Sequence, residues 1–183
     1  ICFKRFGFKK GIEFHSMAEI PSQSGLGSSG SFLVATNLAL NEFFKIKLNK
    51  KKLAELSCEQ EMNYLNKSTG KQDQYAAVFG GFHTMNINKK GKVDITKIDQ
   101  TKIDMNSFKN NILLYYTNIF RSSEKVLSSQ KKNISESKLV QDYMFKIQEI
   151  GYDSYNAILN NNFDEFGKLL DDHYMLKRKT SKL

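Results

Sequence analysis

Apolar and polar residues alternate along residues 12–20, and this pattern predicts a β-strand. Pro21, the only proline of the chain, ends the strand, and the residues that follow it are mostly serine and glycine. Apolar residues then recur at helical spacing, which predicts helices over 31–44, 51–65 and 74–79. A pair of glycines stops the last of these helices.

The second half of the chain begins with a hairpin pattern. Residues 82–87 and 93–98 flank a lysine-rich turn that contains Gly91, which predicts two antiparallel strands. A run of leucines and tyrosines at 111–117 predicts a buried strand. Helical patterns follow over 122–132, 135–160 and 164–177. Because strands and helices do not alternate regularly, the predicted fold class is α+β rather than a repeated βαβ arrangement.

Composition places the chain among ordinary globular proteins, with 183 residues of which 40% are hydrophobic and 26% charged. No segment approaches the ~20 apolar residues of a membrane span, and the N-terminus lacks a signal-peptide pattern. Cys2 and Cys58 have no metal-binding spacing, and with the missing signal they indicate a reducing cytoplasm. The final Ser-Lys-Leu matches a peroxisomal address, but a chance match of three residues is the favoured interpretation.

The net charge of +9 permits two interpretations. A basic chain is typical of nucleic-acid binding. Here, however, the lysines are spread along the sequence and stand beside asparagines, as in Asn49-Lys50-Lys51-Lys52. We therefore favour a solvated lysine surface, which also suits a phosphorylated substrate, and expect neither a nucleic acid nor a membrane as partner.

Residues 21–30 read Pro-Ser-Gln-Ser-Gly-Leu-Gly-Ser-Ser-Gly and lie between a predicted strand and a predicted helix. Glycines let the backbone approach a ligand closely, and the first amides of a helix attract anions. The serines can cap the helix or offer hydroxyl groups to a phosphate or a metal. No Gly-Lys-Ser/Thr follows, so this is not a Walker A loop, and the Gly-x-Gly-x-x-Gly within it lacks a βαβ unit. A loop that only caps a helix remains the alternative.

Two carboxylates downstream suit phosphoryl transfer. Such a reaction needs one group that handles the proton of the acceptor hydroxyl and another that helps to hold Mg²⁺. Glu61 lies on the predicted second helix, and Asp73 precedes an apolar turn that we expect to be buried beside it. Most carboxylates are solvated surface groups, and that alternative applies to both. None of the three histidines, His15, His83 and His173, has ligand-like spacing, and we expect each on the surface.

The ten residues 21–30 resemble the second signature motif of the galactokinase–homoserine kinase–mevalonate kinase–phosphomevalonate kinase (GHMP) superfamily. The resemblance implies a ribosomal protein S5 domain 2-like fold and an ATP-dependent sugar kinase. It also implies that the ATP phosphates are bound by the motif residues Gly25, Leu26, Gly27, Ser28, Ser29 and Gly30. In the same way, Ser29 and Glu61 are implied as Mg²⁺ ligands, with Glu59 as the alternative carboxylate, and Asp73 as the catalytic base.

The string Gly-Lys-Gln-Asp-Gln-Tyr-Ala-Ala at 70–77 resembles the branch that phosphorylates the anomeric hydroxyl of D-glycero-D-manno-heptose 7-phosphate. This implies a sugar phosphate and ATP as small-molecule partners, in the pathway to nucleotide-activated heptose. Lys71 and Arg121 are implied as contacts to the sugar phosphate, although Arg121 also suits a salt bridge and follows Asn118 where the branch has glycine. The alternatives are a galactose or fucose kinase and a binding module without catalysis.

The resemblance runs from about Gly11 to Lys177. It implies a partial ATP-binding domain over 1–105 and the start of a C-terminal domain over 106–183. The first and third signature motifs of the superfamily are absent from the sequence. We therefore expect the chain to be part of a longer or split protein and to be inactive alone; the sequence leaves the oligomeric state open.

Overall fold

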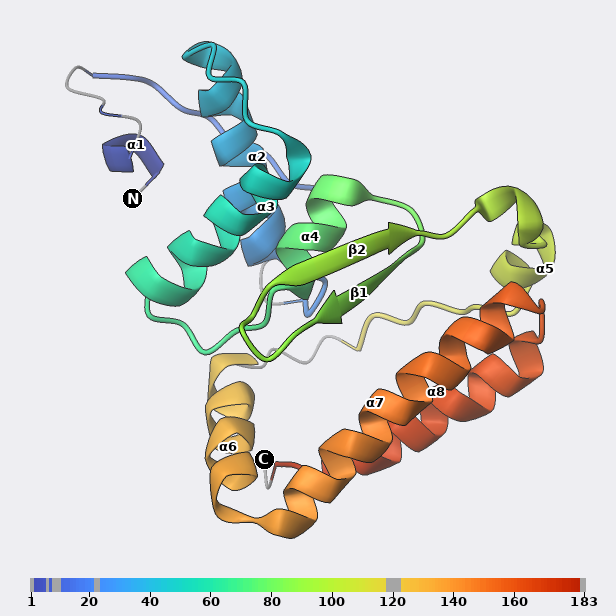
Figure 1. Cartoon of the computed structure of the whole chain (residues 1–183). Helices are drawn as coiled ribbons and strands as arrows, with labels where there is room; N and C mark the ends of the chain where they lie inside the picture. Colours follow the sequence, from blue (N-terminus) through green and yellow to red (C-terminus); the bar gives the residue numbers. More distant parts are fainter. Residues whose placement is uncertain (1, 6, 8–10, 22–23, 118–122, 182–183) are drawn as a thin grey trace. The chain divides into compact units, whose positions relative to one another are not determined.

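The computed structural model describes residues 2–5, 7, 11–21, 24–117 and 123–181 (Figure 1). The chain divides into two compact units, one formed by residues 1–81 and 116–124 and the other by residues 82–115 and 125–183. The described elements are helices and one small antiparallel sheet, so the α+β class is confirmed. The domain boundary expected after residue 105 stays a prediction.

The first unit is helical throughout its regular structure. Its elements in chain order are α1 (Cys2–Arg5), α2 (Ser28–Phe43), α3 (Lys50–Glu59), a π-helical turn (Gln60–Tyr64) and α4 (Gln72–Phe79). The three helices predicted here are confirmed, except that the second one ends in the π turn. The strand predicted over 12–20 is wrong, because this segment pairs with no other strand among the described residues and so makes no ladder of hydrogen bonds.

Polar side chains fill part of the interior where α2 packs on α3. Asn37 donates from Nδ2 to Ser57 Oγ at 3.0 Å and to Gln60 Oε1 at 2.6 Å, and all three residues are fully buried. A small apolar cluster of Cys2, Leu33 and Leu40 lies alongside. These directional hydrogen bonds fix how the two helices meet, while Asn37 Oδ1 and Gln60 Nε2 have no partner among the described residues.

The second unit begins with the predicted hairpin. Strands β1 (His83–Ile87) and β2 (Val93–Lys97) pair antiparallel with Ile87 opposite Val93, and Gly91 in the turn has φ of 74°. Its helical elements are a short 3₁₀ turn (Gln100–Lys102), α5 (Met105–Asn110), α6 (Ser123–Glu136), α7 (Lys138–Leu159) and α8 (Phe163–Arg178). The hairpin and the three long helices are confirmed within a few residues.

The core of the second unit is apolar. Buried isoleucines at 98, 103 and 158 pack with Phe163, and five aromatic or methionine side chains surround them. The turn between α7 and α8 carries Asn161 in the left-handed region, with φ of 55°. The Asn161 side chain accepts a hydrogen bond from Asp104 N at 2.7 Å and donates one to Lys102 O at 3.2 Å, which ties this turn to the segment before α5.

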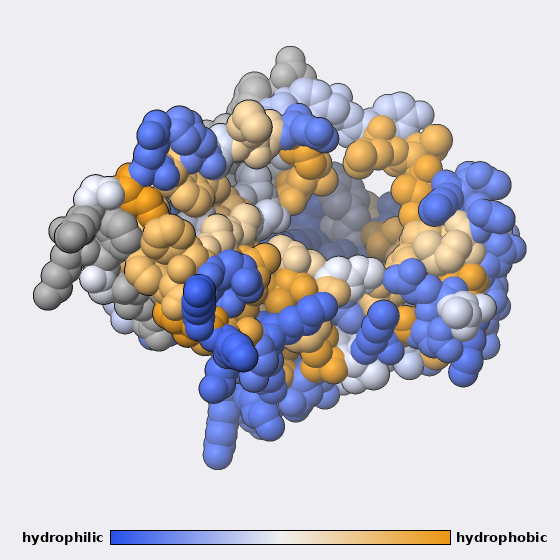
Figure 2. Space-filling model, turned by 90° about the horizontal axis from the view of Figure 1, so that it is seen from above, coloured by the Kyte–Doolittle hydropathy of each residue, from blue (hydrophilic) through white to orange (hydrophobic). Residues whose placement is uncertain are grey.

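The buried strand predicted over 111–117 is wrong. Residues 112–117 belong to no helix or strand, and Leu113, Leu114 and Tyr115 are 77%, 82% and 77% exposed. The segment has apolar side chains that suit a sheet, but no described strand lies beside it. Other apolar residues are exposed too, and Figure 2 shows orange surface interspersed with hydrophilic surface. Among the described helices, none is both long enough and apolar enough to cross a membrane.

Candidate active site

The serine- and glycine-rich loop turns sharply before it enters α2. Gly25 and Gly27 have φ of 81° and 70°, in the left-handed region where glycine is favoured. Gly27 is the N-cap residue of α2, and because it has no side chain the first turn of the helix receives no side-chain cap. The amides at this helix start therefore face outward with the positive end of the helix dipole, an arrangement that attracts anions.

Asp73, in the first turn of α4, lies directly against this loop. A Cβ atom added to Gly27 would lie 3.1 Å from Asp73 Cγ, and one added to Gly30 would lie 3.0 Å from Asp73 Cβ. Only glycine leaves room for so close an approach. The two glycines thus place a half-buried carboxylate beside the amides of the helix start.

Glu61 joins the loop to the helices behind it. The Ser29 hydroxyl donates to Glu61 Oε1 at 2.5 Å, and Gln74 Nε2 donates to Glu61 Oε2 at 2.5 Å. Lys67 Nζ lies 3.7 Å from Glu61 Oε1 and 3.4 Å from Ser29 Oγ. Glu61 is only 4% exposed, so these polar partners replace the water that its carboxylate gives up on burial.

The π turn explains why two successive residues are buried. Leu65 N donates to Gln60 O at 3.0 Å, five residues back, which widens the last turn after α3. Gln60 is 0% exposed and joins the polar network with Asn37, while Glu61 next to it reaches Ser29. One widened turn therefore supplies a residue to the interior of the unit, Gln60, and a residue to its candidate site, Glu61.

Of the residues singled out in the sequence, three come together: Ser29, Glu61 and the loop-facing Asp73. Glu61, rather than the alternative Glu59, carries the hydrogen bond to Ser29. Lys71 lies at the N-cap position of α4, where its carbonyl accepts Tyr75 N at 3.3 Å. Arg121 and Asn118 lie outside the described residues.

Sequence reasoning missed Gln74 and Lys67. Gln74 directly follows Asp73 in the helix, and its burial in an apolar turn is a signal that it needs a polar partner. Lys67 has no such signal, because it stands in a polar turn among many other lysines of this chain. Its place beside Ser29 and Glu61 depends on how the chain folds back after the π turn.

Cys58 lies behind the site, on α3. Its sulfur lies 3.8 Å from the carbonyl of Lys71. Burial raises the pKa of the Cys58 thiol to about 11, an effect that the positive charge of Lys71 partly opposes. The thiol is therefore protonated at neutral pH and is not a nucleophile here.

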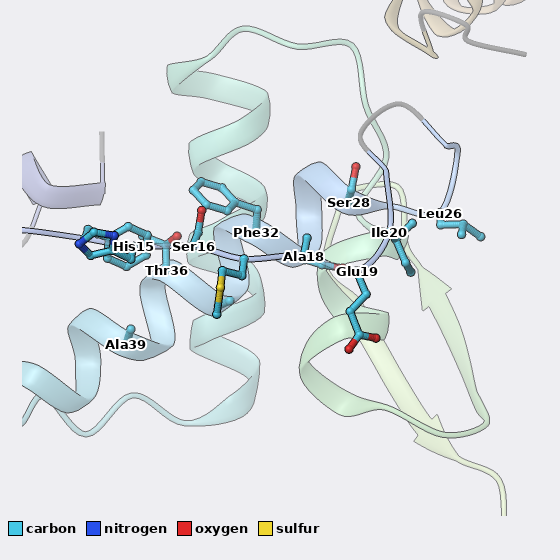
Figure 3. Close-up of a pocket in the computed structure, with 14 residues that line it drawn as sticks. His15, Ser16, Ala18, Glu19, Ile20, Leu26, Ser28, Phe32, Thr36 and Ala39 are labelled. Carbon is cyan, nitrogen blue, oxygen red and sulfur yellow. The ribbon is translucent and has the colours of Figure 1, made fainter. Parts of the chain in front are cut away.

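A hollow of about 610 Å³ lies on the other side of the loop, between the extended residues 14–20 and α2 (Figure 3). Leu26 and Ser28 line it, but Ser29, Glu61 and Asp73 do not. Its walls are mainly apolar, with Phe32 of α2 among them. The contact between Ser29 and Glu61 thus lies outside this hollow, whereas part of the serine- and glycine-rich loop borders it.

The oxygen atoms of the site fit a divalent cation such as Mg²⁺. Mg²⁺ prefers oxygen ligands and takes only one or two carboxylates from a protein, with water and substrate phosphates completing its shell. Ser29 Oγ and Glu61 Oε1, 2.5 Å apart, are such a pair. Within the described part of the chain, no three His, Cys, Asp or Glu side chains gather closely enough to form a metal site by themselves.

Comparison with known proteins finds similarity to sugar kinases. Residues 1–81 match the family described as GHMP kinases N terminal domain. The chain is 27% identical to D-glycero-alpha-D-manno-heptose 7-phosphate kinase of Campylobacter jejuni over 96% of its own length, and 25% identical to galactokinase of Lactiplantibacillus plantarum over 93%. A crystal structure of a D-glycero-D-manno-heptose 1-phosphate kinase from Bacteroides thetaiotaomicron superposes with a TM-score of 0.63 at 27% identity over 88% of this chain.

The match covers only part of each relative. The chain spans 52% of the Campylobacter jejuni kinase, 42% of the Lactiplantibacillus plantarum galactokinase and 46% of the crystallised kinase chain. It therefore corresponds to about half the length of these relatives.

Proposed function

Because residues 1–81 match the GHMP kinases N terminal domain, we propose that the chain belongs to this family and carries the ATP-binding part of a sugar kinase. The observation that supports the proposal best is the convergence of Ser29, Glu61 and Asp73 at the start of α2. The reaction is transfer of the γ-phosphoryl group of ATP to a sugar hydroxyl. Two free cysteines and ATP as substrate suit the cytoplasm.

Each part of the site has a task in this reaction. The amides of residues 25–30 and the start of α2 bind the phosphate oxygens. Ser29 and Glu61 hold Mg²⁺, which neutralises negative charge on the phosphates when it is bound. Gln74 fixes the Glu61 carboxylate through Oε2, which leaves Oε1 directed at Ser29. Asp73 accepts the proton of the sugar hydroxyl as that oxygen attacks phosphorus.

For the substrate we propose D-glycero-D-manno-heptose 7-phosphate, phosphorylated at its anomeric hydroxyl. The string at 70–77 supports this choice, as do the two heptose phosphate kinases among the relatives. Lys71 and Arg121 are the proposed contacts to the sugar phosphate, and the net charge of +9 favours an anionic substrate. Galactokinases match nearly the same residues, so galactose is the second candidate.

ATP binding and phosphoryl transfer test the proposal separately. We expect ATP with MgCl₂ to raise the melting temperature of the chain, and Ser29→Ala to reduce this shift. Ser31→Ala, two residues further along α2, is the matched control because Ser29, and not the exposed Ser31, donates the hydrogen bond to Glu61. An unchanged melting temperature with saturating ATP and MgCl₂ would reject the nucleotide-binding role.

Because the chain is expected to be inactive alone, phosphoryl transfer is measured in the longer or reassembled protein that carries it. The readout is mass spectrometry of the sugar product with heptose 7-phosphate, galactose or fucose as acceptor. Asp73→Asn should preserve ATP binding but lower turnover about 10²–10⁴-fold, because a positioned base is lost. The exposed Asp171→Asn is the control. ATP binding without transfer to any sugar would point instead to a binding module, and preferred transfer to galactose would replace the heptose assignment.

A further inference from the structure

Lys67 places a positive charge at the two oxygens proposed to hold a metal. Its Nζ lies 3.4 Å from Ser29 Oγ and 3.7 Å from Glu61 Oε1. The Lys67 side chain is 40% exposed, whereas that of Glu61 is 5% exposed. The ammonium thus reaches from the surface toward a buried carboxylate.

The backbone holds Lys67 in this position. Asn66 has φ of 51°, in the left-handed region that asparagine tolerates, and it reverses the chain after the π turn. Lys67 N then donates to Glu61 O at 3.2 Å. The residue that faces the Glu61 carboxylate is therefore also hydrogen-bonded to the Glu61 backbone, so the local fold keeps the Lys67 backbone beside Glu61 while its partly exposed side chain can still turn.

A buried carboxylate is stabilised by a nearby positive charge. With no metal bound, Lys67 supplies that charge. A divalent cation held by Ser29 Oγ and Glu61 Oε1 would come within a few ångströms of the ammonium, where like charges repel strongly even when water screens them. The ammonium and the metal therefore compete for one pair of oxygens.

We propose that Lys67 is the resident cation of the Ser29–Glu61 pair and that a divalent metal must displace it. The proposal rests on the assignment of Ser29 and Glu61 as metal ligands under the proposed function. Because its side chain is partly exposed, Lys67 can turn toward the phosphates of an arriving nucleotide. The site would then bind free metal weakly and metal together with a triphosphate well, since the triphosphate draws the ammonium away.

Binding of Mn²⁺, which prefers oxygen ligands as Mg²⁺ does, measures this competition directly. The readout is the melting temperature of the chain as MnCl₂ is added without nucleotide. Lys67→Met removes the charge and should lower the MnCl₂ concentration at the midpoint by about tenfold. Lys67→Arg keeps the charge and should keep the wild-type midpoint. Lys52→Met removes one exposed lysine charge on α3 and is the matched control.

Equal MnCl₂ midpoints for wild type and Lys67→Met would overturn the proposal. A midpoint shift in Lys52→Met as large as that in Lys67→Met would also overturn it. Loss of Mn²⁺ stabilisation in Glu61→Gln should accompany the expected result. Lys67→Gln, which keeps a polar head without charge, serves if Lys67→Met does not fold. No stabilisation by Mn²⁺ in either wild type or the Lys67 variants would also overturn it.

ATP titrations of the same proteins keep the two proposals apart. If ATP does not bind while the Mn²⁺ midpoint still shifts in Lys67→Met, the kinase assignment fails and the role of Lys67 stands. If ATP binds but the Mn²⁺ midpoints are equal, the kinase assignment stands and the role of Lys67 fails. When both proposals are right, added ATP narrows the difference between the MnCl₂ midpoints of wild type and Lys67→Met.

Discussion

The two compact units have different interiors. In the first, fully buried Asn37, Ser57 and Gln60 hydrogen-bond between helices. In the second, buried isoleucines pack with Phe163 around aromatic rings. Hydrogen bonds are directional and apolar contacts are not, so the polar interior fixes orientation while the apolar one supplies mainly cohesion. The unit that must aim Glu61 at Ser29 is the one with the directional interior.

Two glycines of the first unit are also more tightly constrained than two glycines of the second unit. Gly27 and Gly30 of the first unit are pressed against Asp73, whereas Gly151 and Gly167 of the second have no atom within 4 Å of an added Cβ. At Gly27 and Gly30 glycine is required by close approach. On α7 and α8 it is only a helix position without a side chain.

We expect the largest loss of stability from a substitution in the apolar interior of the second unit. Phe163→Ala should reduce the free energy of unfolding by about 3–5 kcal/mol, because it leaves a cavity beside Phe108, whose ring centroid is 5.5 Å away. Urea unfolding followed by circular dichroism measures the change. Phe145→Ala on the exposed side of α7, where the side chain is 63% exposed, should cost far less.

Asn37→Leu should cost about 2–3 kcal/mol although it adds an apolar side chain to a buried position, because Ser57 Oγ loses the Asn37 donor and Gln60 Oε1 keeps only the weak thiol donor of Cys2. The same urea titration applies, with exposed Asn156→Leu on α7 as the control, expected within about 0.5 kcal/mol of wild type. Phe163→Leu should cost less than Phe163→Ala, since leucine refills most of the volume with apolar atoms and leaves a smaller cavity. A neutral Asn37→Leu would remove the distinction between the two interiors.

Gly30→Ala and Gly151→Ala should move stability in opposite directions. The first brings a Cβ to 3.0 Å from Asp73 Cβ and should cost about 1–3 kcal/mol while pushing α4 away from the loop. The second meets no atom and should add about 0.5–1 kcal/mol, since alanine favours a helix interior. Melting temperatures of the two variants give the signs. Stabilisation by both would mean that Asp73 is not held against the loop.

The smallest effect concerns pH. The pKa of Cys58 is raised by burial from 9.0 to about 11, so the unfolded chain loses this proton first. The stability that the protonated Cys58 thiol contributes is complete below pH 9 and is lost as the pH rises through 11. The loss in unfolding free energy is about 1 kcal/mol at pH 10. The unfolding free energy of wild type minus that of Cys58→Ala, compared at pH 8 and pH 10, isolates this group from other titrations.

Reaction with iodoacetamide gives an independent measure of the same burial. Native Cys58 should react slowly at pH 8 and rapidly in urea, because thiolate is the reacting form. Rapid labelling of Cys58 in the native chain, measured in a Cys2→Ala background, would contradict the burial of α3 against the rest of the first unit.

Hydrophobic periodicity predicted the helices well because a helix forms its backbone hydrogen bonds within its own segment. The apolar periodicity of α7 is a local feature, and so is the hairpin turn at Gly91. In α2 the helix was predicted but its buried face was not, since Phe32, Leu38 and Phe43 are exposed. The strands expected at 12–20 and 111–117 failed for the opposite reason. A strand requires a neighbour, and the sequence of the segment does not say whether one lies beside it.

The candidate site likewise has features that the sequence predicts and features that depend on the fold. The motif residues and the downstream acids were apparent from the sequence, and the structure brings Ser29 and Glu61 into contact. Their roles stay predictions. Lys67 and the π turn were not predictable, since the widening of one turn by one residue depends on packing and leaves no periodic signal.

The π turn also has an evolutionary consequence. Gln60 belongs to the polar network of the interior and Glu61 to the site, yet the two are neighbours in one backbone turn. A deletion or insertion there would rotate both side chains at once. Selection therefore cannot adjust packing and chemistry independently at this point, and we expect homologues to vary Asn37, Gln60 and Glu61 as a set.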